Sequence, residues 1–532
     1  MFEITSTDLL GRKGQITTQK GSIRTPCFVP VVHPDQTKNL VDVKQFSSTY
    51  DVDLIITSSY ILRKKFADKK IDLHEQTNFY GPIMTDSGAY QSLVYGEIEI
   101  TPESAISFQE KIHSDFGVPL DIPISIKDNY ITAKDKVEIT IERCKDMSKY
   151  VKGTQTNWVG PIQGGRYLDL IEKSSREISK INIFNMFAIG SVVELMSDYN
   201  YDILVDMIIT AKRFLNPSKP LHLFGAGHPS MFPLIVAAGC DSFDSASYSL
   251  YAQDDRYITN TQTFQLDDLD EFPCNCPNCL STTPQKLLEF PKNNRMVFLA
   301  SHNLYVCQAE IRSIRRAITS GTLWELLESR VNAHPSLKDG FNKLMKHADE
   351  LLANTPSTKK KGIFLVSKNS LMRPEIKSHQ IKFENINFTN RKKLILISII
   401  DTKLSEIYNL IRPLKAYLNK SEVMSSEFEL WLLDEYFGLI PLEISEAFPL
   451  VQYIVSERIS NKNMKLKLLE SIRLIEKLKF DEINLIGNLN AINELVVLQR
   501  ILTNTKIKGF NIHIDEKEIT NIIDILDYLI KN

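Results

Sequence analysis

The segment NWVGPIQGGRYLDLIEKSSREISKINIFNMFAIGS, residues 157–191, contains the pattern that decides the fold. An apolar run begins at Asn157 and ends in Gln-Gly-Gly, and an amphipathic stretch follows from Tyr167 to Lys180. A second apolar run begins at Asn185 and ends in Gly-Ser. Continuous apolar runs indicate strands that are buried on both faces of a parallel sheet. The amphipathic stretch between them is then the connecting helix.

The same pattern repeats along the first two-thirds of the chain. Apolar runs that end in Gly, Ser, Asp or Pro begin at eight positions: CFVPVV at Cys27, DLIITSS at Asp53, GPIMTDSG at Gly81, GVPLDIP at Gly117, NWVGPIQGG at Asn157, NMFAIGS at Asn185, PLHLFGAG at Pro220 and CDSFDSAS at Cys240. Eight βα units within about 250 residues predict an α/β protein with a closed (β/α)8 TIM barrel. An open doubly wound sheet is the main alternative. Residues 2–24 are predicted to form a hairpin ahead of the first barrel strand.

Three cysteines crowd into six residues of an otherwise cysteine-poor chain. Cys274, Cys276 and Cys279 are followed after 22 residues by His302. Three thiolates and one imidazole form a complete tetrahedral shell, which is typical of one structural zinc ion per chain. Spacing alone leaves His334 and Cys307 as alternatives for the fourth ligand.

Composition and pattern together predict two domains. The segment NTPSTKKKG, residues 354–362, is typical of a linker. We expect a barrel domain over residues 1–353, with a zinc-binding subdomain around residues 270–320, and an α/β domain over residues 363–532. In the second domain strands are predicted at LILISII from Leu394, INLIG from Ile483 and FNIHI from Phe510, and helices over residues 403–420, 464–479, 491–502 and 516–530.

Charge and hydropathy limit the classes of partner. The 532 residues carry a net charge of −2, so RNA binding has to come from a local basic patch. Residues 355–420 hold 14 Lys and Arg against 4 Asp and Glu, a local net charge of +10. No apolar run approaches the ~20 residues that span a bilayer. We therefore expect a cytoplasmic protein with no membrane partner.

Two carboxylates stand at equivalent points of two predicted strands. Asp86 follows Ile-Met-Thr, and Asp244 follows Ser-Phe. Both are expected at the C-terminal rim of the barrel, where active sites of this fold form. Enzymes that break glycosidic bonds commonly use a pair of carboxyl groups, one as nucleophile and the other as acid or base. Helix capping by each aspartate is the structural alternative.

Other strand ends add polar groups to the same rim. We expect Asp121 to end the fourth strand, Gln163 the fifth and Gly190 the sixth. A carboxylate, an amide and exposed backbone can together recognise the edge of a purine. Tyr90 follows Asp86 by four residues and can stack on a flat base.

These strings resemble the tRNA-guanine transglycosylase family, in particular its archaeal branch. The resemblance covers residues 1–345 and the string EYFGLIPLEISEAFPLVQY from Glu435. The barrel strings are TDSGAYQ from Thr85, PLDIP from Pro119, PIQGG from Pro161, AIGSVV from Ala188, FDSASYSLYA from Phe243, CNCPNC from Cys274 and SHNLYV from Ser301.

The resemblance implies a function. Archaeal members exchange a guanine in the D-arm of tRNA for 7-cyano-7-deazaguanine, on the way to archaeosine, by double displacement through a covalent aspartyl-ribose intermediate. Asp244 corresponds to the nucleophile and Asp86 to the general acid/base, although the two roles are also assigned in reverse. Tyr90 corresponds to the residue that stacks on the base.

The resemblance also assigns partners and the remaining site residues. Asp121, Gln163 and Gly190 correspond to base-recognition positions. The partners are tRNA, guanine and 7-cyano-7-deazaguanine, and the chain is expected to form a homodimer. Archaeal members commonly carry a PUA domain; none is evident in this sequence, which makes a separate PUA-domain protein a candidate partner. The alternatives are a non-catalytic tRNA-binding partner subunit and a zinc-stabilised barrel that acts on a small molecule.

Without an evident PUA domain, the basic stretch is the candidate surface for tRNA phosphates. Neutralising Arg391, Lys392 and Lys393 together is expected to weaken tRNA binding and to flatten its salt dependence. Each lost phosphate contact removes about 0.7–0.9 from the slope of log affinity against log salt. An unchanged slope, measured over a salt series, would mean that these charges form only a solvated face.

Overall fold

The computed structural model describes residues 2–66, 71–89, 100–153, 155–385, 392–400, 402, 404–421, 426–450, 452–455, 470, 471, 473–475, 477, 478, 480–488, 509–515 and 522–531. The chain divides into two compact units, Met1–Asn354 and Thr355–Asn532. No helix within these described ranges is both long and apolar enough to cross a membrane.

The first unit contains the predicted parallel barrel. Its sheet has the order β4-β11-β10-β9-β8-β7-β6-β5, and every pair is parallel. A parallel bridge between Val31 and Ile56 joins the two ends of this order. The strands are β4 (Cys27–Pro30), β5 (Ile55–Ser58), β6 (Ile83–Asp86), β7 (Phe116–Gly117), β8 (Asn157–Ile162), β9 (Phe184–Ile189), β10 (Leu221–Leu223) and β11 (Ser242–Ser245). The TIM-barrel prediction is confirmed, and the doubly wound alternative is wrong.

The fourth strand is shorter than its apolar run predicts. β7 ends at Gly117, so Asp121 lies four residues beyond the strand and does not end it. Pro119 and Pro123 lack the N–H group that a ladder needs, which explains why pairing stops early.

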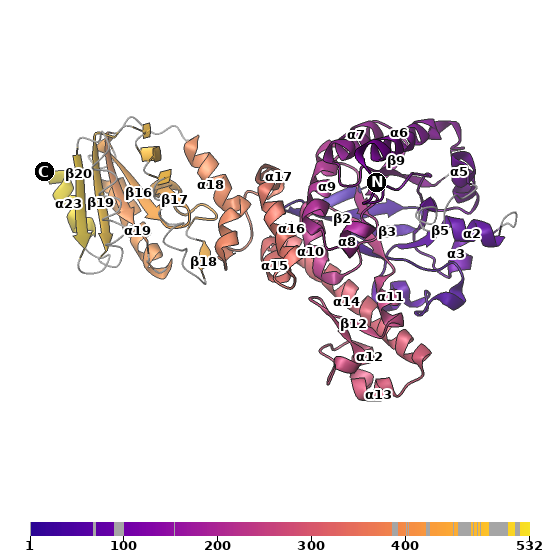
Figure 1. Ribbon diagram of the computed structural model, residues 1–532. Coiled ribbons are helices and arrows are strands. Elements are labelled where there is room, and N and C mark those ends of the chain that lie inside the picture. Colours follow the sequence, from indigo (N-terminus) through magenta and orange to yellow (C-terminus); the bar gives the residue numbers. More distant parts are fainter. Residues whose placement is uncertain are drawn as a thin grey trace. The chain divides into compact units, whose positions relative to one another are not determined.

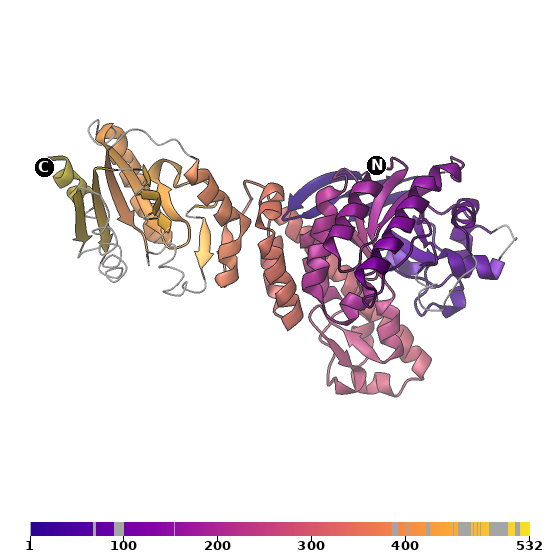
Figure 2. The ribbon, with the colours of Figure 1, turned by 45° about the horizontal axis from the view of Figure 1, so that its top comes forward.

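Helices surround the barrel strands (Figures 1 and 2). They are α1 (Gln45–Tyr50), α2 (Ser59–Phe66), α3 (Leu73–Thr77), α5 (Pro102–Lys111), α6 (Tyr130–Asp146), α7 (Leu168–Ser179), α8 (Val193–Ser197), α9 (Tyr201–Phe214), α10 (Phe232–Ala238), α11 (Ser247–Gln253), α15 (Leu323–Val331), α16 (Pro335–Lys346) and α17 (Ala348–Asn354). Most of the large apolar core lies between these helices and the outward side chains of the strands.

The predicted N-terminal hairpin is part of a three-stranded antiparallel sheet. It consists of β1 (Phe2–Asp8), β2 (Gly11–Thr18) and β3 (Gly21–Thr25). Ile16 and Ile23 of this sheet pack with inward side chains of the barrel, such as Val29 and Met84. Because the sheet leads directly into β4, it covers the N-terminal end of the barrel and leaves the C-terminal end for the site.

The segment after β11 forms the metal-site subdomain. It contains β12 (Arg256–Ile258), β13 (Thr263–Gln265), α12 (Pro277–Ser281), α13 (Pro284–Leu288) and the start of α14 (Lys292–Ser320). The long helix α14 runs from this subdomain along the barrel (Figure 1). One helix therefore connects the cysteine cluster to the barrel.

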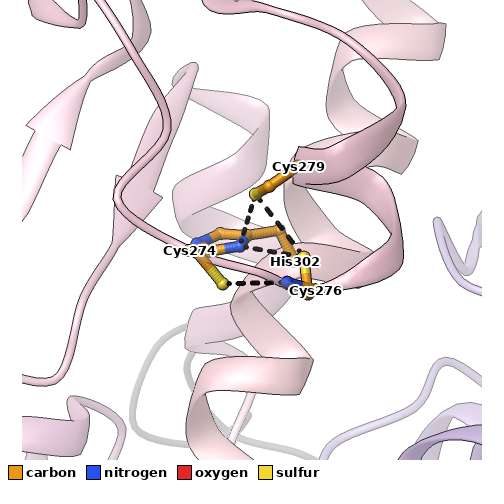
Figure 3. Close-up of side chains that lie close together, drawn as sticks. All are labelled: Cys274, Cys276, Cys279 and His302. Carbon is orange, nitrogen blue, oxygen red and sulfur yellow. Dashed lines mark hydrogen bonds between the residues drawn. The ribbon is translucent and has the colours of Figure 1, made fainter.

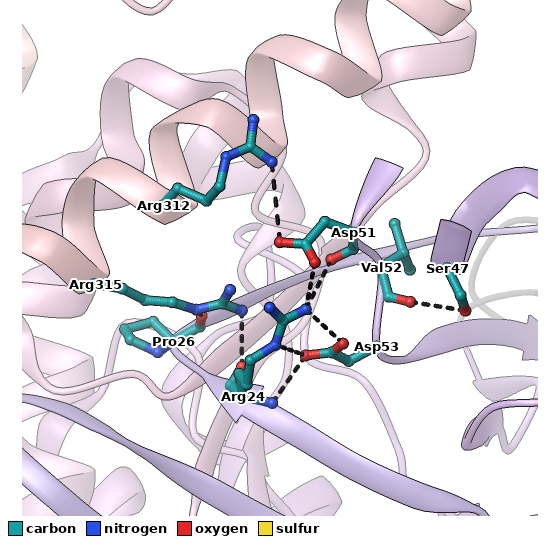
Figure 4. A network of polar contacts seen from close by, with 8 residues as sticks. All are labelled: Arg24, Pro26, Ser47, Asp51, Val52, Asp53, Arg312 and Arg315. Carbon is teal, nitrogen blue, oxygen red and sulfur yellow. Dashed lines mark hydrogen bonds and ion pairs between the residues drawn. The ribbon is translucent and has the colours of Figure 1, made fainter. Parts of the chain in front are cut away.

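A polar network fixes the far part of α14 to the N-terminal end of the barrel (Figure 4). Arg315 donates to the carbonyl oxygens of Pro26 (2.8 Å) and Arg24 (2.9 Å). The Arg24 guanidinium contacts Asp53 at 2.7 Å and Asp51 at 2.6 Å, and Arg312 lies 4.0 Å from Asp51. These contacts join α14 to the residues that precede β4 and β5.

The second unit contains the predicted α/β domain. Its sheet has the order β17-β16-β15-β19-β20, with only β17 antiparallel among these strands. The strands are β15 (Lys393–Ser398), β16 (Phe428–Asp434), β17 (Gly438–Pro441), β19 (Glu482–Asn488) and β20 (Gly509–Asp515), and β14 (Ile363–Leu365) pairs with β18 (Tyr453–Val455). The helices are α18 (Pro374–Glu384), α19 (Leu404–Lys420) and α23 (Ile522–Lys531).

The predicted strands correspond to β15, β19 and β20, whereas β16 and β17 were not predicted. The helix predicted over residues 403–420 corresponds to α19, and the one over 516–530 overlaps α23. The helix predicted over residues 491–502 lies outside the described residues, as do most of residues 464–479. Short 3-10 turns complete the elements: η1 (Gln36–Lys38), η2 (Met147–Lys149), η3 (Pro229–Met231), η4 (Leu266–Asp268), η5 (Lys368–Met372) and η6 (Leu442–Ile444).

The basic stretch of the second unit has acidic neighbours. The Lys392 ammonium lies 3.8 Å from Asp481, and the Lys393 ammonium lies 3.7 Å from Glu427 and 3.8 Å from Glu482. Arg391 lies outside the described residues. The positive field at these lysines is therefore smaller than residues 355–420 alone indicate, and tRNA contact here stays a prediction.

Candidate active site

Five of the six predicted base and catalytic residues line one cavity in the barrel. The cavity has a volume of about 410 Å³ and lies at the C-terminal ends of the strands. Asp86 is the last residue of β6 and Asp244 lies in β11, whereas Gln163 and Gly190 directly follow β8 and β9. Its lining includes Asp86, Asp121, Gln163, Gly190 and Asp244, with apolar walls from Val31, Ile56, Val118 and Phe224. Tyr90 lies outside the described residues.

Asp86 is a carboxyl group that gains a proton easily. Its Oδ1 accepts hydrogen bonds from the Ser58 hydroxyl and the Gly88 N–H, both at 3.0 Å. Burial nevertheless raises the pKa of Asp86 to about 7, and the charge of Asp244 adds to the rise. Near neutral pH, Asp86 can therefore both give and take a proton.

Asp244 lies in a different environment within the same cavity. Its Oδ1 accepts from the Gly225 N–H at 2.9 Å and from Nε2 of His222 at 3.1 Å. Oδ2 has no hydrogen-bond partner among the described residues. One carboxylate oxygen is thus fixed, and the other is available for chemistry.

A chain of hydrogen bonds connects the ends of four neighbouring strands. The Ser87 hydroxyl donates to Asp121 at 3.2 Å, and the Gln163 amide donates to Asp121 at 2.6 Å. Ser191 then donates to Oε1 of Gln163 at 2.5 Å, which fixes the orientation of the amide. Burial raises the pKa of Asp121. The chain presents an ordered carboxylate and amide edge to the cavity.

Gly190 contributes space rather than a free donor. A Cβ atom at this position would lie 2.4 Å from Nε2 of Gln163, so a larger residue would displace the Gln163 amide from its present place. The Gly190 N–H is already bonded to the carbonyl of Ile162 at 3.0 Å. Ser191, the next residue, has a positive φ of 62°, and its hydroxyl accepts from the Ile124 N–H at 2.7 Å. Glycine is therefore required here so that Gln163 can reach Asp121.

The cysteine cluster forms a compact set of metal ligands (Figure 3). The ligand atoms of Cys274, Cys276, Cys279 and His302 all lie within 4.8 Å of one another. Nδ1 of His302 lies 3.3 Å from the Cys279 sulfur and 3.5 Å from the Cys276 sulfur. A tetrahedral zinc–thiolate shell has ligand–ligand edges of about 3.8 Å, so the four groups fit such an ion after a small expansion.

Neighbouring groups orient the histidine of this cluster. Nε2 of His302 donates to the carbonyl of Ile258 at 2.9 Å, which leaves Nδ1 for a metal. The Tyr257 ring stacks on the imidazole, with 3.7 Å between ring centroids. Cys307 is buried apart from the cluster, and the His334 ring stacks on Tyr199. Of the three candidates for fourth ligand, the structure brings only His302 to the cysteines.

With this geometry in view, the comparisons with known proteins decide the family. The family model described as queuine tRNA-ribosyltransferase (TGT) matches residues 7–336. The chain belongs to this family. The resemblance predicted from the motifs is therefore confirmed, and the protein is a ribosyltransferase enzyme that acts on guanine in tRNA.

Relatives named tRNA-guanine(15) transglycosylase are similar along most of the chain. The relative from Saccharolobus solfataricus is 39% identical over 494 residues, which cover 91% of this chain and 97% of the relative. The one from Methanococcus aeolicus is 39% identical over 462 residues, 85% of this chain and 68% of the relative. The one from Sulfolobus acidocaldarius is 37% identical over 455 residues, 85% of this chain and 88% of the relative.

Several residues in and beside the cavity were not predicted from the sequence. Ser87 and Ser191 stand beside predicted residues, so their proximity was a usable signal. Glu194 accepts from the Ile126 N–H at 2.6 Å and thereby holds the loop after Pro123, but nothing in its local sequence indicates this. His222 is fully buried beside Asp244 and carries no motif signal either.

Replacing a cluster cysteine tests the metal site. Cys276→Ser is expected to lower metal content and thermal stability together, because a closed thiolate shell contributes directly to folding free energy. Metal analysis and thermal unfolding of the purified protein measure both. Cys307→Ser is the matched control, since it changes a buried cysteine outside the cluster and should retain the metal. Unmutated protein without bound metal would contradict the assignment.

The raised pKa of Asp86 predicts a pH-dependent stability cost. Between pH 4 and 7 the unfolded chain ionises Asp86 while the folded chain keeps it protonated, so folding loses stability as pH rises. Asp86→Asn removes this effect. Its stability relative to the unmutated protein should therefore rise by up to about 4 kcal/mol between pH 4 and 7 and stay constant above pH 7.

Denaturant unfolding at a series of pH values measures this difference. Asp135→Asn, on the exposed part of α6, is the control and should leave the difference flat. A flat difference for Asp86→Asn would contradict the environment assigned to Asp86.

Proposed function

We propose that the protein exchanges guanine 15, in the D-arm of tRNA, for 7-cyano-7-deazaguanine through a covalent link between Asp244 and the ribose. The single observation that carries the proposal is the pairing of two unlike carboxyl groups in one cavity: Asp86, with a pKa of about 7, and Asp244, with one oxygen fixed by two donors. The position in tRNA follows the name that the relatives carry.

The hydrogen-bonded side chains of Asp121 and Gln163 can recognise the base. Guanine presents N–H donors at N1 and N2, which suit the carboxylate of Asp121, and a carbonyl oxygen at C6. Nε2 of Gln163 uses one of its two hydrogens toward Asp121, so the second is left for this oxygen. 7-Cyano-7-deazaguanine has the same edge, so one pocket accepts both the leaving and the incoming base. The target nucleotide has to leave its stack to enter the cavity.

The first displacement breaks the bond between ribose C1′ and guanine N9. Oδ2 of Asp244 attacks C1′ as positive charge develops on the ribose, and protonated Asp86 gives its proton to the leaving base. The products are neutral guanine, an aspartyl-ribose ester and ionised Asp86. A pKa near 7 favours the acid role for Asp86 at neutral pH and leaves Asp244 as the nucleophile.

The second displacement forms the new bond between ribose and base and returns a proton to Asp86. N9 of 7-cyano-7-deazaguanine loses its proton to Asp86 and attacks C1′, and the carboxylate of Asp244 leaves. Two displacements retain the configuration at C1′ and restore both carboxyl groups. The cycle needs no redox or organic cofactor.

We propose zinc as the metal of the cysteine cluster. Thiolate and imidazole ligands suit this ion, and four protein ligands leave no position for water or substrate, so a bound zinc ion supplies folding stability rather than catalysis. Residues 363–532 are proposed as an accessory tRNA-binding domain. The homodimer and a separate PUA-domain partner stay predictions.

Exchange of labelled guanine tests the function. The unmutated protein is expected to release labelled guanine from tRNA when 7-cyano-7-deazaguanine is added, and not from tRNA that carries adenine at position 15. Asp244→Asn should fold normally and lose the exchange, because an amide is nearly isosteric with the carboxylate and a poor nucleophile. Normal exchange by this variant would move the nucleophile role to Asp86.

A further inference from the structure

His222 is a buried histidine that forms a hydrogen bond with the proposed nucleophile, Asp244. It lies in the middle of β10, and its side chain is 0% exposed. β10 and β11 are parallel, with His222 opposite Ser242 in the register. Ser242 and Asp244 are two residues apart on β11, so their side chains lie on the same face. The three side chains therefore meet inside the barrel.

The hydrogen bonds of this group fix one tautomer. The Ser242 hydroxyl lies 2.8 Å from Nδ1 of His222, and Oδ1 of Asp244 lies 3.1 Å from Nε2. The carboxylate has no proton to give, so Nε2 carries the hydrogen and donates it. When the ring carries only this hydrogen, Nδ1 accepts from the Ser242 hydroxyl. With the Gly225 N–H at 2.9 Å, Oδ1 receives two donors.

The two donors form hydrogen bonds of different strength with the two states of Asp244 in the reaction. In the free enzyme Oδ1 shares the negative charge of a carboxylate, and in the ester intermediate it is a neutral carbonyl oxygen. Hydrogen bonds to ionised acceptors are roughly twice as strong as those to neutral ones. The His222 N–H therefore stabilises the carboxylate more than the ester.

We propose that His222 is a positioning residue that aims Oδ2 of Asp244 at C1′ and promotes departure of the Asp244 carboxylate in the second displacement. In that step the C1′–Oδ2 bond breaks, and its electron pair returns to the carboxylate. The new bond forms from C1′ to N9 of the incoming base, and the N9 proton goes to Asp86. His222 keeps its own proton throughout and touches no reacting atom. The inference rests on the proposed function, because it needs an aspartyl-ribose intermediate.

Two amide substitutions separate this role from simple core packing. In His222→Gln the side-chain nitrogen reaches the place of Nε2 and can still donate to Asp244. In His222→Asn it reaches only the place of Nδ1, beside Ser242. Both variants put an amide of similar polarity into the same buried position, so a loss of stability affects them alike.

The experiment follows the denaturation-resistant protein–tRNA adduct during steady-state exchange with saturating 7-cyano-7-deazaguanine. We expect His222→Asn to lower kcat about 10- to 100-fold, which reaches only the lower end of the roughly 100- to 1,000-fold loss found when one donor is removed from an oxyanion site. The adduct fraction should rise several-fold, because its breakdown becomes slower than its formation. His222→Gln should retain most of kcat and a normal adduct fraction.

The outcomes separate failure of this inference from failure of the proposed function. No adduct in the unmutated protein, together with exchange by Asp244→Asn, would remove the proposed function and the inference with it. A normal adduct in the unmutated protein, with equal behaviour of the Gln and Asn variants, would overturn the inference alone. A fall in kcat of His222→Asn without adduct accumulation would also overturn it, because formation of the ester would then be the step affected.

Discussion

Closure of the parallel sheet is the constraint on which the site depends. β4 pairs with β11, the bridge between Val31 and Ile56 joins β4 to the β5 side, and all eight strands point the same way. Their C-terminal ends therefore meet around one cavity, which brings Asp86 and Asp244 together from opposite parts of the domain sequence. At the other end, the three-stranded N-terminal sheet packs against inward side chains of the barrel, and the cavity lies at the C-terminal end.

Within that cavity, burial and hydrogen-bond donors give chemically identical carboxyl groups different environments. Asp86 accepts two hydrogen bonds, but burial dominates and its pKa rises to about 7. One oxygen of Asp244 is held by the Gly225 N–H and His222, and the other has no hydrogen-bond partner among the described residues. Asp121 forms hydrogen bonds with Gln163 and Ser87, which suits its proposed role in base recognition. The proposed roles of acid, nucleophile and recognition group thus follow from environment rather than from residue type.

Much of the barrel and the cavity could be predicted from the sequence, because buried parallel strands are continuous apolar runs with polar residues at their ends. The end of β7 was misplaced because prolines stop ladder pairing inside an apolar run. His222 was missed because its partners come from the register of β10 against β11, which no local pattern encodes. The acidic neighbours of Lys392 and Lys393 come from distant segments. The net charge of residues 355–420 therefore predicts a stronger positive electrostatic field at these two lysines than the structure has.

Mapping the covalent link is the most direct measurement of the central claim, that Asp244 attacks the ribose while Asp86 handles the proton. The adduct formed with tRNA in the absence of incoming base is digested with protease and nuclease, and the modified peptide is sequenced by mass spectrometry. The account predicts a ribose-linked mass on the peptide that contains Asp244. The same mass on the peptide that contains Asp86 would contradict it.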